Sequence, residues 1–282
     1  MQLGLNDDSK TIYLTDASQL MEVATMAHIA RPTVEHDMSI GTNLYDVQLV
    51  CDSLANEFDI GRDLWFTQAR WTNLVRSYLD PELVTRFVKA SREIYNKRGK
   101  DGVVTEMQFK SNKRSAKKHK WGNCLLSASY RGQVDSHIKP TLVFHSRVTY
   151  MGYISGLDIG LATVLAKYIA GRERLSDIGL IWKIDVSQVH AFKTLPWLYA
   201  HRNLLDYVLR LDTPTALRIQ KWHEMVLKYE KQGKPIDDEL YGPLRRVRQI
   251  WYNSNNGILR PPSIINDLDF SKLEGLGVDY DM

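Results

Sequence analysis

Cysteine, long apolar runs and net charge are all scarce in this chain. Cysteine occurs twice in 282 residues, as Cys51 and Cys124, and the pair shows neither a disulfide framework nor the spacing of metal ligands. No apolar run reaches the roughly 18 residues that a membrane-spanning helix needs, so the sequence predicts no membrane span. The N-terminal segment lacks a basic region followed by an apolar core, which predicts no signal peptide. Together these absences predict a protein of the reducing cytoplasm.

The small charge and the apolar content indicate the general class of protein. The net charge of +4 is too small to indicate nucleic-acid binding by itself, and it is compatible with a small anionic ligand such as a phosphate. Hydrophobic residues make up 44% of the chain, which is enough to bury a full core. Without an internal repeat or a low-complexity linker, we expect residues 1–282 to form one domain.

Hydrophobic periodicity and turn residues predict helices first and strands in the middle of the chain. We expect helices at 16–30, 45–58, 63–79, 81–96, 158–170 and 214–232. Asp16 and Thr213 are the expected N-caps, and Gly171 and Gly233 the expected C-terminal stops. We expect strands at 103–110, 124–132, 140–148 and 178–189. This order predicts an α+β class with a mostly antiparallel or mixed sheet.

Cys124 begins a predicted strand, and two interpretations of it stay open. Free cysteine is often buried and acts as a small hydrophobe. Alternatively, the run from Lys110 to Lys120 holds six Lys or Arg residues, and such a positive field lowers a thiol pKa and favours the nucleophilic thiolate. The same run is also typical of a solvated loop or of a surface that grips nucleic-acid phosphates.

Arg147 and Asp158 are the charged residues around an otherwise apolar strand and helix. Arg147 ends the strand, and a buried arginine needs a partner, either a structural carboxylate or a ligand phosphate held through two parallel hydrogen bonds. Asp158 opens the helix, where local physics favours an N-cap.

The segment "RVTYMGYISGLDIGLATVLAKYIA" resembles the signature of the thymidylate synthase family. In that family an arginine after a strand is followed by a Gly-containing loop, an asparagine and an apolar helix, with the interval found here between Arg147 and Asp158. Cys124 occupies the place of the family's catalytic cysteine, at the head of a strand that forms a hairpin with the arginine strand. Downstream, "IWKIDVSQVHAF" is similar to the family's strand and its H-x-Y motif. The resemblance covers about residues 95–200.

The acid at Asp158 is the informative departure, because the family has an asparagine there that reads uracil. Cytosine reverses the hydrogen-bonding pattern of uracil, offering a donor at N4 and an acceptor at N3, and a carboxyl group complements it. In this respect the chain is similar to the deoxycytidylate hydroxymethylases of phages and the cytidylate hydroxymethylases of nucleoside-antibiotic pathways. The resemblance implies that Asp158 reads a cytosine as well as capping the helix.

The resemblance implies roles for further residues. Asp63, or Glu57 as the fallback, takes the place of a glutamate that organises water near the base. Tyr150 and Trp65 are the implied folate contacts, because the family's folate-contacting aspartate lies near Tyr150 in this sequence. The implied substrate contacts are Arg147, His190, Ser187 and Arg31. The second subunit lends a further basic pair, which is either Lys97 and Arg98 or Lys113 and Arg114. Two further departures are Leu125, which follows the cysteine in place of histidine, and Phe192, which lacks the hydroxyl that touches the ribose.

The implied activity is one-carbon transfer to C5 of a pyrimidine nucleoside monophosphate, dCMP or CMP, in a homodimer packed through the sheet. Cys124 adds to C6 of the ring, and C5 attacks the one-carbon unit of 5,10-methylenetetrahydrofolate. The product is hydroxymethyl or methyl, and a dUMP-acting enzyme is an alternative within the same fold. Two other classes stay open: a catalytically silent nucleic-acid-binding protein that uses residues 110–120, and a helical interaction protein in which the spacing is chance.

Overall fold

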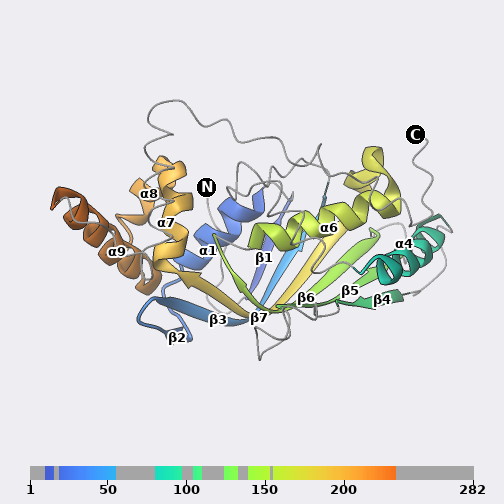
Figure 1. Ribbon diagram of the computed structural model, residues 1–282, viewed down its shortest axis with the longest axis horizontal. Coiled ribbons are helices and arrows are strands. Elements are labelled where there is room, and N and C mark those ends of the chain that lie inside the picture. Colours follow the sequence, from blue (N-terminus) through green and yellow to red (C-terminus); the bar gives the residue numbers. More distant parts are fainter. Residues whose placement is uncertain are drawn as a thin grey trace.

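A mixed β-sheet forms the centre of the fold (Figure 1). The computed structural model describes residues 10–15, 19–54, 80–96, 104–109, 124–132, 139–152 and 155–232. The strands are β1 (Thr11–Leu14), β2 (His36–Asp37), β3 (Gly41–Cys51), β4 (Val104–Gln108), β5 (Leu125–Arg131), β6 (Thr141–Tyr150) and β7 (Gly179–His190). Their order is β1-β3-β7-β6-β5-β4, with β2 paired to β3. The β1–β3 and β6–β7 pairs are parallel and the other pairs antiparallel, which confirms the predicted α+β class with a mixed sheet.

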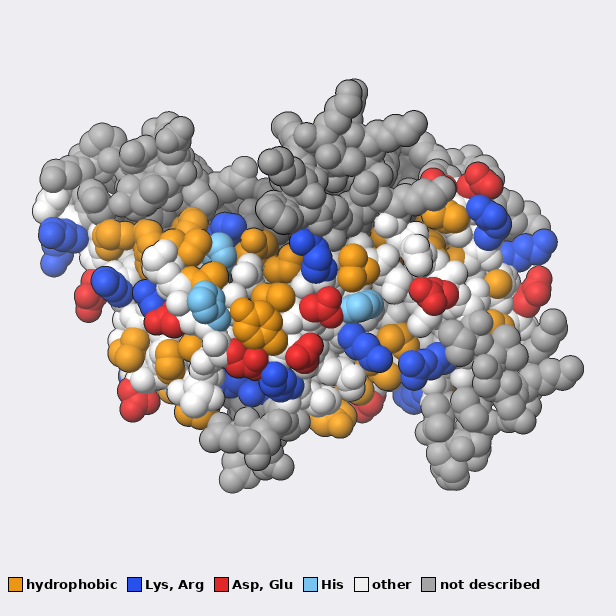
Figure 2. Space-filling model, turned by 90° about the horizontal axis from the view of Figure 1, so that it is seen from below, with side chains coloured by type: hydrophobic (Ala, Val, Ile, Leu, Met, Phe, Trp, Pro, Cys, Tyr) orange, Lys and Arg blue, Asp and Glu red, His pale blue; other side chains and the backbone are white. Residues whose placement is uncertain are grey.

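The described helices lie along one face of this sheet (Figure 1). They are a π-helical segment (Leu20–Ala24), α1 (Thr25–Ile29), α4 (Pro81–Asn96), α6 (Ser155–Ala170), a 3₁₀ segment (Arg172–Asp177), α7 (Ala191–Ala200), α8 (Arg202–Val208) and α9 (Pro214–Lys231). The opposite face carries apolar and charged side chains intermixed (Figure 2). No described helix is long and apolar enough to cross a membrane.

The core lies between the sheet and the helices. Trp182 is fully buried on β7 beside Phe144 of β6, and its indole N–H donates to the hydroxyl of Ser146 at 2.8 Å. Such a bond satisfies the one polar group of a large buried aromatic side chain. Pairs of this kind fix which face of each strand is turned toward the helices.

In the central strands, every second residue is buried, and this alternation shifts by one residue at one level of the sheet. On β6 the fully buried positions step from Ser146 to Thr149, and on β7 they step from Ile184 to Ser187, an odd interval in each case. On β3 the change falls at Asp46, which has a left-handed φ of 55° that aspartate tolerates better than most residues. The register between these strands stays unbroken, so they change together. Thr149 and Ser187 consequently lie side by side, buried at the same level of the sheet.

Two expectations are wrong in the described part of the chain, one about a helix and one about an N-cap. The helix expected at 45–58 is the end of β3 as far as Cys51, because Val47, Leu49 and Cys51 are buried with a period of two. Asp158 is not the N-cap of its helix, because α6 begins at Ser155 and Asp158 lies within the first turn. An acid there still suits the positive end of the helix dipole.

Several other expectations are confirmed. Helix α4, strands β4 to β7 and helix α9 occur where the sequence predicts them, and the helix expected at 16–30 is helical over 20–29. Thr213 caps α9, since its hydroxyl accepts the N–H of Ala216 at 3.3 Å. Gly171 ends α6 with a φ of 83°. The cap expected at Asp16, the helix at 63–79 and the stop at Gly233 lie outside the described residues.

Candidate functional site

Cys124 and Arg147 are joined at the start of β5 and the end of β6. The backbone N–H of Arg147 donates to the carbonyl of Cys124 at 2.7 Å, just beyond the ladder pair of Leu125 and Ser146. The side chain of Arg147 also acts on the thiol of Cys124, whose pKa it lowers by its charge and as a hydrogen-bond donor. The hairpin expected from the sequence therefore places the predicted nucleophile and the predicted phosphate ligand next to each other.

Asp158 approaches the same place from α6. Its side chain is 4% exposed, and the hydroxyl of Thr149 on β6 donates to its Oδ2 at 3.3 Å. Burial raises the pKa of Asp158 from 3.8 to about 7, and the bond from Thr149 opposes that rise. A pKa raised toward neutrality brings both the charged and the protonated form of this carboxyl group within reach near pH 7, so it can accept or donate a hydrogen bond.

The charges of these groups act on one another. Burial raises the pKa of the Cys124 thiol above 9.0, and the charge of Asp158 raises it further. The charge of Arg147 and its hydrogen bond lower the pKa of the thiol but do not outweigh the burial. The basic run 110–120, which we expected to lower this pKa, lies outside the described residues.

Tyr150 and His190 extend the cluster toward α7. Burial raises the pKa of the Tyr150 phenol; the charge of Cys124 raises it further, and that of Arg147 lowers it. The ring of His190 meets that of Tyr150 edge to face at 4.7 Å, and the ammonium of Lys193 lies 4.5 Å from the centre of the Tyr150 ring. Burial, and then the charge of Lys193, lower the pKa of His190 to about 4, so this histidine is neutral near pH 7.

Ser187 lies on β7 beside Thr149 and is held by a histidine that the sequence did not single out. His28 of α1 contacts the carbonyl of Ser187 through Nε2 at 3.2 Å. A carbonyl only accepts, so Nε2 carries the proton. Burial lowers the pKa of His28 to about 4, with Arg31 as a smaller cause acting in the same direction, although the bond to Ser187 opposes the shift. The buried Arg31 therefore lies within electrostatic reach of His28, which contacts Ser187.

Several buried polar atoms around these residues have no hydrogen-bond partner among the described residues. They are Nε of Arg147, Oγ of Ser187, Nδ1 of His190, Nδ1 of His28, Oδ1 of Asn43 and Oγ1 of Thr25. Buried polar atoms in native proteins are usually satisfied by protein, by ordered water or by a ligand. A concentration of such atoms at the ends of β3, β6 and β7 is typical of a site for a polar molecule.

The structure thus brings Cys124, Arg147, Asp158 and Tyr150 together, with His190 adjoining them and with Ser187 beside Thr149. The contributions of Thr149, His28 and Lys193 were missed by sequence reasoning, since each depends on a neighbour from a distant element. The remaining candidates lie outside the described residues: Asp63, Glu57, Trp65, Lys97, Arg98, Lys113 and Arg114.

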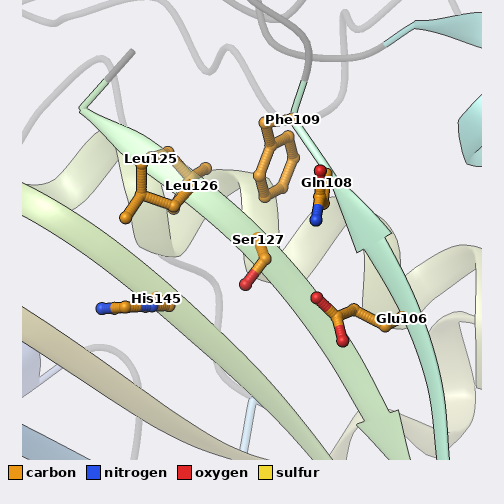
Figure 3. Close-up of a pocket in the computed structure, with 7 residues that line it drawn as sticks. All are labelled: Glu106, Gln108, Phe109, Leu125, Leu126, Ser127 and His145. Carbon is orange, nitrogen blue, oxygen red and sulfur yellow. The ribbon is translucent and has the colours of Figure 1, made fainter. Parts of the chain in front are cut away.

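A separate cavity of about 480 Å³ lies over β5, between β4 and β6 (Figure 3). It is lined by Glu106, Gln108, Phe109, Leu125, Leu126, Ser127 and His145. Ser127 lies between His145 and Glu106 in this view, and His145 in turn pairs with Asp185 at 2.7 Å. Leu125 directly follows Cys124 in the sequence, but the residues that line this cavity include none of the reactive groups of the cluster around Cys124.

No group of three or more His, Cys, Asp and Glu side chains in the described ranges is arranged to hold a metal ion. Comparison with models of known protein families gives no match, and comparison with curated proteins gives none either.

Proposed function

We propose that this chain is a pyrimidine nucleotide C5 one-carbon transferase with the thymidylate synthase fold. The preferred substrate is a cytosine nucleoside monophosphate, dCMP or CMP, the product is the 5-hydroxymethyl nucleotide, and 5,10-methylenetetrahydrofolate supplies the one-carbon unit. One observation carries the proposal: a cysteine, an arginine and a buried acid from three separate elements meet at one place.

Cys124 is the nucleophile of this proposal. Its thiolate adds to C6 of the ring, which makes C5 nucleophilic toward the one-carbon unit. Arg147 lies against the thiol and favours its charged form, although the thiol pKa of the free protein remains raised. The proposed chemistry therefore requires that substrate binding help to ionise Cys124.

Asp158 is the residue that reads the base. A protonated carboxyl group donates to N3 of cytosine and accepts from N4, whereas uracil presents the reverse pattern. A pKa of about 7 makes the protonated form accessible at physiological pH. An ordinary surface aspartate, with a pKa near 3.8, would offer that form only in acid solution.

Buried hydrogen-bond donors without a partner among the described residues are the groups that would bind the 5′-phosphate. Nε of Arg147 and Oγ of Ser187 are buried without a partner among the described residues, and the buried Arg31 lies near His28 on α1. A guanidinium binds phosphate through parallel hydrogen bonds, and such binding energy also orients the ring over the nucleophile. Tyr150, half-buried beside Cys124, is the described residue that would contact the folate.

Release of tritium from C5 tests this proposal directly. We expect [5-³H]dCMP or [5-³H]CMP to lose tritium only when methylenetetrahydrofolate is present, and mass spectrometry of the product to give hydroxymethylcytidylate. Cys124→Ala should abolish release while leaving nucleotide binding largely unchanged, because the thiol acts after binding. Absence of release from dCMP, CMP and dUMP in folded protein would contradict the proposal. In that case salt-sensitive binding of nucleic acid would be the next property to measure.

A further inference from the structure

Among the described residues, two acids and one adjacent cation, Arg147, make up the charged centre of the cluster around Cys124. The thiol of Cys124 and the carboxyl of Asp158 influence each other's charge, and the guanidinium of Arg147 is the cation that acts on the thiol. The other titratable groups described here are the phenol of Tyr150, the imidazole of His190 and the ammonium of Lys193. The two rings are neutral near pH 7, and Lys193 lies over the ring of Tyr150.

The geometry assigns Arg147 to Cys124 and leaves Asp158 without a counter-charge among the residues that the structure describes. The backbone N–H of Arg147 donates to the carbonyl of Cys124 at 2.7 Å, and the charge of the Arg147 side chain lowers the pKa of the Cys124 thiol. Asp158 is 4% exposed and accepts from the hydroxyl of Thr149, and it makes no ion pair with any described residue. Two negative charges beside one guanidinium in a buried site repel each other strongly.

We propose that Cys124 and Asp158 hold a single negative charge between them. Before a nucleotide binds, the negative charge lies on the carboxylate of Asp158, and Cys124 is an unreactive thiol. A ligand that leaves a proton on Asp158 moves the charge to Cys124 and so creates the nucleophile. Asp158 is then a switch for the reactivity of Cys124 as well as a reader of the base.

The order of ionisation supports this assignment. Asp158, with a pKa of about 7, loses its proton before Cys124, whose thiol pKa is raised above 9.0 in part by the charge of Asp158. Groups coupled in this way titrate as a pair. The first proton lost from the pair near neutral pH therefore comes from the carboxyl group, and the thiol retains its own.

The second part of the inference rests on the proposed function. Cytosine binds through its N3 acceptor and N4 donor to a protonated Asp158, so the proton of the Cys124 thiol moves to an Asp158 oxygen and the net charge of the site is unchanged. Uracil donates N3–H to the carboxylate and keeps the charge on Asp158. The base is consequently selected in kcat, through ionisation of the nucleophile, as well as in KM.

Alkylation of the free protein tests the switch without any substrate. Iodoacetamide reacts with the thiolate, and of the two cysteines Cys51 is 2% exposed, so mass spectrometry can follow Cys124 alone. We expect Asp158→Asn to lower the pH midpoint of alkylation and to raise the rate at pH 8, by roughly tenfold for each pKa unit. Thr149→Val, which removes the bond that favours the charged carboxylate, should shift the rate in the same direction by less.

Asp185→Asn is the matched control. Asp185 lies on β7, pairs with His145 and is not among the charges that act on Cys124, so its removal should leave the alkylation profile unchanged. An unchanged midpoint in both Asp158→Asn and Thr149→Val, with folding shown by circular dichroism, would overturn the inference even if tritium release succeeds.

Cysteine labelled with ¹³C at Cβ then tests the role of the base. Without folate, we expect dCMP to convert the Cys124 resonance from its thiol value to that of the thiolate or of a C6 adduct, and dUMP to leave the thiol. Equal responses to the two nucleotides would overturn the role of the base. If neither nucleotide binds, that result would instead contradict the proposed function. The alkylation result would still decide whether Cys124 and Asp158 share one charge.

Discussion

Asp158 combines burial, a hydroxyl partner and closeness to a thiol, and this combination makes its substitution by asparagine informative. The amide of Asp158→Asn presents the donor and acceptor that uracil requires, with no proton to exchange. We expect the variant to lose most of its turnover of dCMP and to gain preference for dUMP, because an unpaired buried polar group costs about 1–3 kcal/mol. Ratios of kcat/KM for the two nucleotides measure this shift, and an unaltered ratio would remove Asp158 from base recognition.

The same substitution should change how stability depends on pH. The folded pKa of Asp158, about 7, lies above its ordinary value of 3.8, so the folded state keeps a proton that the unfolded chain loses. Stability from this group is full below about pH 4 and is lost as the pH rises through 7. Relative to the wild type, Asp158→Asn should therefore become more stable as the pH rises across this window.

Urea unfolding at several pH values measures this difference. Each pKa unit corresponds to about 1.4 kcal/mol, so the change in relative stability is on the order of a few kcal/mol. His28 and His190, whose folded pKa values are lowered to about 4, act in the opposite direction, but they are present in both proteins and cancel. A relative stability that stays constant between pH 4 and 8 would show that Asp158 is not buried in this way.

At the scale of elements, a turn at Met151 and Gly152 follows β6, six residues before Asp158. Gly152 in this turn has a φ of 71°, and a Cβ there would lie 2.8 Å from Cγ2 of Thr194 and 3.0 Å from Cγ2 of Thr25. Gly152→Ala combines backbone strain with a clash, and we expect a loss of roughly 2–4 kcal/mol in the free energy of unfolding.

Gly171 offers the matched control for this substitution. Its φ of 83° is equally left-handed, but a Cβ would meet no atom within 4 Å. Gly171→Ala should therefore lose only the backbone part, about 1 kcal/mol. Equal losses for the two variants in urea unfolding would show that the contacts of Gly152 with α1 and α7 do not constrain the turn.

Elements with a clear local signal were predicted from the sequence, and elements decided by distant contacts were not. Strands β5 to β7 alternate or are strongly apolar, and α6 ends at a glycine, so local pattern sufficed. The end of β3 shows a mixture of periods of two and three to four, and pairing with β7 decided it as strand. Helix α7 was missed because Pro196 counts against a helix in a sequence reading.

The candidate site divides in the same way. Cys124, Arg147 and Asp158 were singled out because their order and spacing along the chain resemble those of the thymidylate synthase family. The bond from Thr149 to Asp158 and the contact of His28 with Ser187 depend on how the sheet changes its buried face, which no local pattern indicates. The cap expected at Asp158 failed for the same reason, since a tertiary contact replaced a local one.

At the scale of the whole molecule, the resemblance to the thymidylate synthase family implies a dimer packed through the sheet, and the sheet face opposite the helices is the surface we expect it to use. Ile181 at the centre of β7 pairs with Val143 on β6 and Val50 on β3, and alternation turns this apolar row away from the buried Trp182. The next row along carries Lys183 and His145, so apolar and charged positions lie together on this face (Figure 2).

We expect the wild-type chain to sediment as a dimer of 32.5 kDa subunits and Ile181→Lys to sediment as a folded monomer. A lysine in the apolar row would place an unpaired charge in the interface, which such interfaces exclude. Leu217→Lys on α9, where the side chain is 51% exposed, is the control and should remain dimeric. The monomer should also lose tritium release, because the family resemblance implies that basic residues of the second subunit complete the phosphate site. A monomeric wild type that still releases tritium would show that one chain completes the site alone.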